Sequence, residues 1–86
     1  MVTETLETIP STGELLDRVA TLRTDAALMD GYAQRLLATA GALTDRAVAP
    51  VWGRPTLEQQ AAACTTAAEQ LRTAAEALLA HMRAGG

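Results

Sequence analysis

The side chains best suited to metal binding or nucleophilic chemistry are those of Cys64 and His81, the only cysteine and the only histidine in the chain. They are 17 residues apart, which is about 25 Å along a helix at 1.5 Å per residue. They therefore cannot share a metal ion within one chain, and a lone cysteine excludes an internal disulfide and a cysteine-based zinc site. We predict that Cys64 is a buried small hydrophobic residue and that His81 lies near a helix C-terminus, where a cation suits the helix dipole.

The glutamate side chains also give no good candidate for a metal site. Glu69 and Glu76 lie seven residues apart on one expected helix face, but the sequence lacks the Glu-x-x-His pattern of di-iron helical bundles. These two side chains are predicted to form a solvated stripe. We therefore expect no catalytic residue, no metal and no cofactor.

One enzyme family is kept as a remote alternative. Leu22-Arg23, Asp30 and Leu36-Leu37 resemble the opening pattern of the small helical chorismate mutases, whose active site needs several arginines and usually a lysine around a dianionic substrate. Ala40 occupies the position where an inward arginine would follow Leu36-Leu37, and the chain has no lysine. The prediction is that the protein is not an enzyme.

The composition favours a small all-α protein. The chain has 86 residues, of which 49% are hydrophobic and 2% aromatic, and 19 alanines and 12 leucines supply strong helix formers. Valine and isoleucine are too few for a β architecture. A net charge of −3 argues against binding to a nucleic-acid backbone, and no apolar run is long enough for a membrane span.

Helix-start signals divide the chain into three parts. Ser11-Thr12-Gly13-Glu14 and Thr56-Leu57-Glu58-Gln59 both fit a capping box, and each follows a proline. Two prolines and a glycine within residues 49–55, just before the second box, are expected to interrupt any helix. We predict a flexible arm over 1–11 and a helical hairpin over 12–84, with a helix over 12–48, a loop over 49–55 and a helix over 57–84. Asp30-Gly31 leaves open whether the first helix is broken into two.

Apolar residues recur in alternating steps of four and three, the spacing of coiled-coil helices. A seven-residue loop then predicts that the two helices pack antiparallel. The predicted helix–helix interface consists of Leu22, Ala26, Met29, Ala33, Leu36, Ala40 and Leu43 of the first helix and Leu57, Ala61, Cys64, Ala68, Leu71, Ala75 and Leu78 of the second. Because one position in each heptad is alanine, we expect an interaxial distance near 8 Å, with leucines of one helix over alanines of the other.

Further apolar residues lie outside this interface. Leu16, Leu28, Leu37 and Leu79 would stay in contact with water if the two helices faced only each other. Surface of this kind usually marks a partner interface, and a four-helix bundle would bury it. We predict a homodimer, or a heterodimer with another helical hairpin or an effector's N-terminal domain.

A short turn containing Trp52-Gly53 between two helices, in a chain of fewer than a hundred residues, resembles the WXG-type family of type VII secretion substrates. The similarity covers about 13–82 in architecture. Here, however, tryptophan and glycine are adjacent. The family's C-terminal export signal, a tyrosine followed four residues later by an acid, is missing, since the only tyrosine is Tyr32. That departure implies that a partner carries the signal.

The resemblance implies a non-catalytic secretion substrate, or a helical partner or chaperone of a secreted effector. The alternative is a cytoplasmic helical adaptor or assembly subunit without an export role. The first ten residues lack the features of a conventional signal peptide, so the chain is expected to be cytoplasmic when made and, if secreted, to use another route. Trp52 is also predicted to pack over the end of the hairpin.

Overall fold

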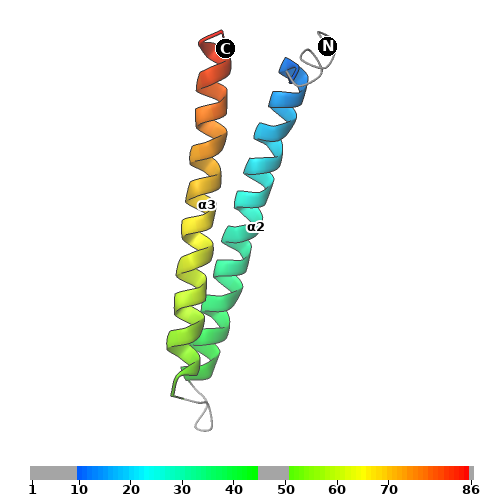
Figure 1. Ribbon diagram of the computed structural model, residues 1–86. Coiled ribbons are helices and arrows are strands. Elements are labelled where there is room, and N and C mark those ends of the chain that lie inside the picture. Colours follow the sequence, from blue (N-terminus) through cyan, green and yellow to red (C-terminus); the bar gives the residue numbers. More distant parts are fainter. Residues whose placement is uncertain (1–9, 45–50, 86) are drawn as a thin grey trace, which may run out of the picture.

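The computed structural model describes residues 10–44 and 51–85 and shows two long α-helices, α2 (Thr12–Thr44) and α3 (Gly53–Arg83). The helices pack against each other, with the start of α2 and the end of α3 at the same end of the hairpin (Figure 1). The predicted all-α antiparallel hairpin is confirmed. Three predicted segments lie outside the described residues: arm residues 1–9, helix residues 45–48 and the first two loop residues, 49–50. No helix in the described part is long and apolar enough to cross a membrane.

Helix α2 begins at its predicted N-cap. The backbone N–H of Glu14 donates a hydrogen bond to Ser11 Oγ at 3.1 Å, and the N–H of Leu15 donates to the Ser11 carbonyl at 3.0 Å. The first bond satisfies a donor that the helix itself leaves without an acceptor, and the second is the first backbone hydrogen bond of the helix. The helix then runs without interruption through Asp30-Gly31, so the first helix is not broken at this dipeptide.

Replacing Ser11 with alanine is expected to lower the free energy of unfolding by about 1 kcal/mol, because the Glu14 N–H loses its acceptor. Urea denaturation followed by circular dichroism measures this change. Ser11→Asp supplies a carboxylate acceptor and should keep the stability of the native chain. Equal losses in both variants would contradict the capping role.

Helix α3 begins at Gly53, four residues before the predicted start, so the prediction of a loop extending to residue 55 is wrong. Trp52 is the N-cap residue, and its carbonyl accepts from the N–H of Thr56 at 3.1 Å. That bond places Thr56 inside the helix, so Thr56 does not open a capping box. Pro55 fits here because N–H groups of the first turn have no intrahelical acceptor to lose.

Helix α3 ends at Arg83, and Gly85 follows its C-cap residue, Ala84. Gly85 has a φ of +82°, which an L side chain would disfavour. The N–H of Ala84 donates to the Ala80 carbonyl and that of Gly85 to the Met82 carbonyl, both at 3.1 Å. His81 and Arg83 lie in the last turn, where positive charge suits the helix dipole.

The core of the hairpin is a line of small side chains, which we call the alanine row. Every member is at most 4% exposed, and three of them are fully buried. The row repeats every seven residues on both helices, and Gly53 is buried at the first position of α3. Its members are Val19, Ala26, Ala33 and Ala40 of α2 and Ala61, Ala68 and Ala75 of α3.

Candidate interaction surface

The larger residues of the predicted interface are only half-buried. Because the alanine row brings the helix backbones close together, little space is left between them for leucine, and the larger side chains are displaced to one side. We call this second line the leucine face. It consists of Leu15, Leu22, Met29, Leu36 and Leu43 of α2 and Leu57, Cys64, Leu71 and Leu78 of α3.

The two sides of the hairpin differ in polarity. On the side away from the leucine face, Arg72 Nη2 donates to Asp30 Oδ2 across the two helices. Within α3, Arg54 Nε also lies 3.7 Å from Glu58 Oε1. Both pairs are exposed, so each contributes little to stability. The Asp30–Arg72 pair nevertheless defines the antiparallel register, because it places residue 30 of α2 at the level of residue 72 of α3.

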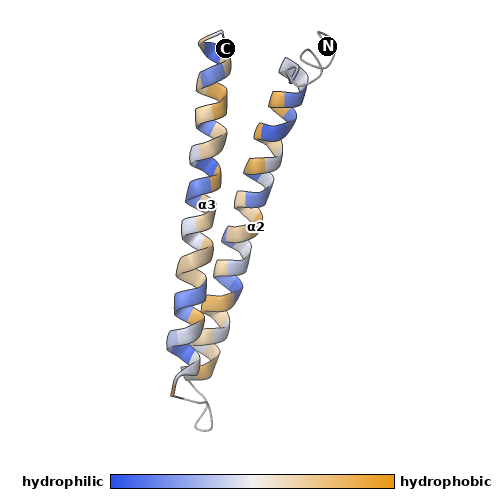
Figure 2. Cartoon of the chain, in the orientation of Figure 1, coloured by the Kyte–Doolittle hydropathy of each residue, from blue (hydrophilic) through white to orange (hydrophobic). Residues whose placement is uncertain are grey.

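This register brings the predicted interface residues together in layers. Ala33 and Ala68 lie at nearly the same level, and so do the two other alanine pairs, Ala26 with Ala75 and Ala40 with Ala61. Leucine-face residues alternate with these pairs along the hairpin. Hydrophobic and hydrophilic residues accordingly alternate around both helices, and neither helix is apolar on all sides (Figure 2).

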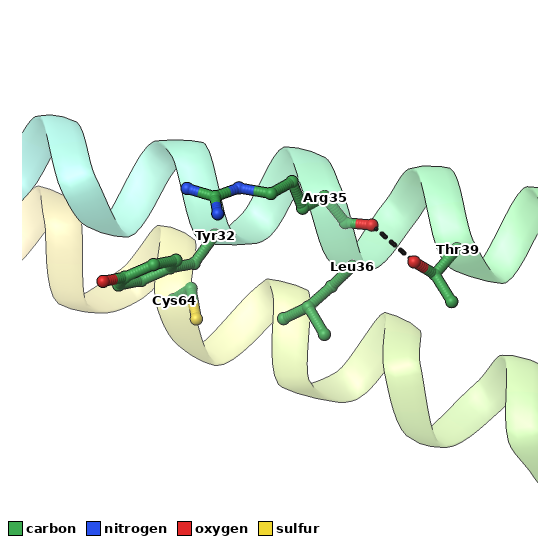
Figure 3. A pocket seen from close by; sticks show the side chains of 5 residues that line it. All are labelled: Tyr32, Arg35, Leu36, Thr39 and Cys64. Atoms are coloured by element: carbon green, nitrogen blue, oxygen red, sulfur yellow. Dashed lines mark hydrogen bonds between the residues drawn. The ribbon is translucent and has the colours of Figure 1, made fainter.

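The leucine face is hollowed at two places. A shallow depression of about 380 Å³ is lined by Tyr32, Arg35, Leu36, Thr39 and Cys64 (Figure 3). The Arg35 guanidinium carbon lies 5.2 Å from the centre of the Tyr32 ring, close enough for a cation–π contact. Thr39 Oγ1 donates to the Arg35 carbonyl at 3.0 Å.

A second depression, of about 320 Å³, lies nearer the start of α2 and the end of α3. Leu22 and Leu78 meet there from the two helices, beside Asp17, Arg18 and Thr21. Each depression is thus lined by leucine-face residues of both helices, which shows that these residues lie on one side of the hairpin. The lining of both depressions is mostly apolar, and its charged residues come from α2.

Two large exposed side chains border the leucine face. Leu28 is 47% exposed and Tyr32 is 42% exposed, and both lie on the same edge of α2. Tyr32 is missing from the predicted interface, although its step of four from Leu28 is a signal that could have identified it. Leu16 and Leu37 are similarly exposed, at 49% and 51%, but lie on the side of the Asp30–Arg72 ion pair.

The prediction that Trp52 packs over the end of the hairpin is wrong. Its side chain is 68% exposed, and the neighbouring Val51 is 95% exposed. Trp52 is the residue at which the turn becomes helix, and its backbone accepts the first helical hydrogen bond. The turn therefore presents the indole to solvent while Gly53, the next residue, is buried.

Replacing Trp52 with alanine is expected to change the free energy of unfolding by no more than about 0.5 kcal/mol, since few contacts in the hairpin depend on the indole. Thermal unfolding followed by circular dichroism measures this. A loss of 2 kcal/mol or more would show that the side chain packs on the hairpin after all.

The two candidate reactive residues remain apart. Cys64 lies at the base of the first depression and is half-buried, not fully buried as predicted. His81 is exposed in the last turn of α3. Within residues 10–44 and 51–85, no three or more histidine, cysteine, aspartate or glutamate side chains are grouped so that they could hold a metal ion.

The surface with the most distinctive geometry is therefore the leucine face, an apolar strip along two helices with two depressions. It is suited to contact with other helices. In comparisons with known proteins, no family model, no curated protein and no solved structure matches this chain.

Proposed function

We propose that the protein is a non-catalytic helical hairpin that acts by binding a second helical hairpin along the leucine face, as a WXG-like secretion substrate or as the partner of a secreted effector. The observation that carries this proposal is the half-buried state of the leucine face beside the buried alanine row. A hairpin with one covered line and one uncovered line of apolar side chains is half of a four-helix bundle.

The turn supports the export role. Trp52 is exposed although it is the only tryptophan in the chain, and it gives little packing to the hairpin itself. An exposed aromatic side chain is available for recognition by another protein. The same turn holds the two residues on which the resemblance to the WXG-type family depends.

Secretion from a bacterial host with an active type VII system tests the proposal. The tagged chain, coexpressed with its neighbouring genes, is expected in the culture filtrate of the parent strain and absent from that of a strain lacking the system's ATPase. A cytoplasmic marker controls for lysis. Retention of a stable chain in both strains would contradict export and leave the adaptor role as the better explanation.

Trp52→Ala gives a second measurement in the same assay. Because this variant should keep the stability of the hairpin, the proposal predicts a loss of secretion with an unchanged amount of protein in the cells. Val51→Ala, which alters the equally exposed neighbour, is the matched control and should be secreted normally.

A further inference from the structure

The edge of α2 beside the leucine face carries a line of residues that is complementary to itself. These residues follow each other in alternating steps of four and three, which places them on one strip of the helix. We call it the α2 edge strip. It consists of Thr21, Asp25, Leu28, Tyr32, Arg35 and Thr39.

The order of the strip is symmetric about residue 30. Leu28 and Tyr32 lie two residues on either side of it, and Asp25 and Arg35 lie five residues on either side. Thr21 and Thr39 complete the series at nine residues. Two antiparallel copies of the strip would thus pair leucine with tyrosine, aspartate with arginine and threonine with threonine.

Helix α3 has a matching strip about the same level of the hairpin. The Asp30–Arg72 ion pair places residue 72 level with residue 30. On the leucine-face edge of α3, Gln70 and Ala74 lie two residues from Arg72, and Ala67 and Ala77 lie five residues from it. These side chains are small or uncharged, so a second α3 meets no charge repulsion there.

We propose that the occupant of the leucine face is a second copy of this chain, packed antiparallel about a two-fold axis at the level of Asp30 and Arg72. This inference rests on the proposed function and names the hairpin that completes the bundle. In a two-fold interface each residue i that contacts j of the partner is matched by j contacting i, which is the pattern of the strip. Two ion pairs form, each between Asp25 of one copy and Arg35 of the other.

The depressions and the exposed side chains fit this arrangement. Leu28 of one copy lies level with Tyr32 of the other, where the depression of about 380 Å³ is open. Asp25 forms no ion pair within the described residues of its own chain and is free to pair with a second copy. With the axis at residues 30 and 72, about 43 Å of α2 (16–44) and about 35 Å of α3 (61–83) face the second copy. A face about 20 Å wide then gives about 1,600 Å² of surface over both copies, the size of a standard stable interface.

Charge reversal tests the inference by sedimentation equilibrium and native mass spectrometry of the full chain. The native protein is expected to be a dimer at micromolar concentration. Asp25→Arg places two arginines at each contact, and Arg35→Asp places two aspartates there, so each variant alone should dimerise at least tenfold more weakly. An equimolar mixture should restore dimers that contain one chain of each variant.

Glu76→Arg makes the same change of charge on the outer face of α3 and should leave the dimer intact. Circular dichroism confirms the helix content of each variant, and recovery in the mixture shows that both can fold. A native monomer at 100 μM would overturn the inference but not the proposed function, whose secretion assay uses coexpressed partners. The inference would also be overturned if Asp25→Arg and Arg35→Asp each dimerised as strongly as the native chain.

Discussion

Replacing Ala68 with leucine is expected to lower the free energy of unfolding by about 1–3 kcal/mol, the usual cost of forcing a larger side chain into a well-packed site. Ala68 has no exposed surface, and it lies level with Ala33 of α2, which is only 4% exposed. A leucine at this position can fit only if the two helices move apart. For a domain of this size, 1 kcal/mol corresponds to about 4–8 °C in melting temperature.

The control for this prediction is Ala62→Leu, on the same helix. Ala62 is exposed, so the same substitution there adds no volume to the contact between the helices. Both variants should be melted at one fixed protein concentration, because association changes apparent stability. An unchanged melting temperature for Ala68→Leu would show that the alanine row does not set the distance between the helices.

The second large effect concerns association. Leu28→Glu is expected to raise the dissociation constant of the proposed dimer about 30-fold or more. Full burial of a leucine contributes about 1.5–3 kcal/mol, and about half of the Leu28 surface remains to be buried, so each copy loses about 1 kcal/mol and the dimer about 2 kcal/mol. The added carboxylate would also lose water at the interface, which increases the loss.

Leu37→Glu provides a closely matched comparison. Leu37 is 51% exposed against 47% for Leu28, and both lie on α2, but Leu37 is on the side of the Asp30–Arg72 ion pair. Its replacement should leave the dissociation constant within about twofold of the native value. Sedimentation equilibrium of both variants measures the difference. If both substitutions raised the dissociation constant equally, the leucine face would not be the specific interface.

The heptad pattern was sufficient to predict the hairpin. Small residues at every seventh position of two helices can be buried only against each other, and all of the described alanines at those positions are buried. The pattern did not show that the leucines would stay half-buried. That outcome depends on how closely the helices approach, and the spacing of apolar residues does not specify this distance.

The turn was predicted less well, for local reasons. Pro55 was interpreted as a helix breaker, yet a proline in the first helical turn interrupts no hydrogen bond. The direction of the Trp52 side chain depends on the backbone of the turn and not on the identity of the residue. The composition and the spacing of residues therefore could not predict that the Trp52 side chain is exposed.

The alanine row also has a consequence for changes in chain length. Because the same small side chain recurs every seven residues, the contact surface of each helix looks nearly the same after a translation of one heptad, about 10.5 Å along the axis. Packing alone therefore distinguishes poorly between registers, and the short connection between Thr44 and Gly53 must select the observed one, to which the exposed Asp30–Arg72 pair adds little. Removing one complete heptad from each helix at the same level would leave the remaining layers matched, so this architecture can vary in length by whole heptads without altering how its helices pack.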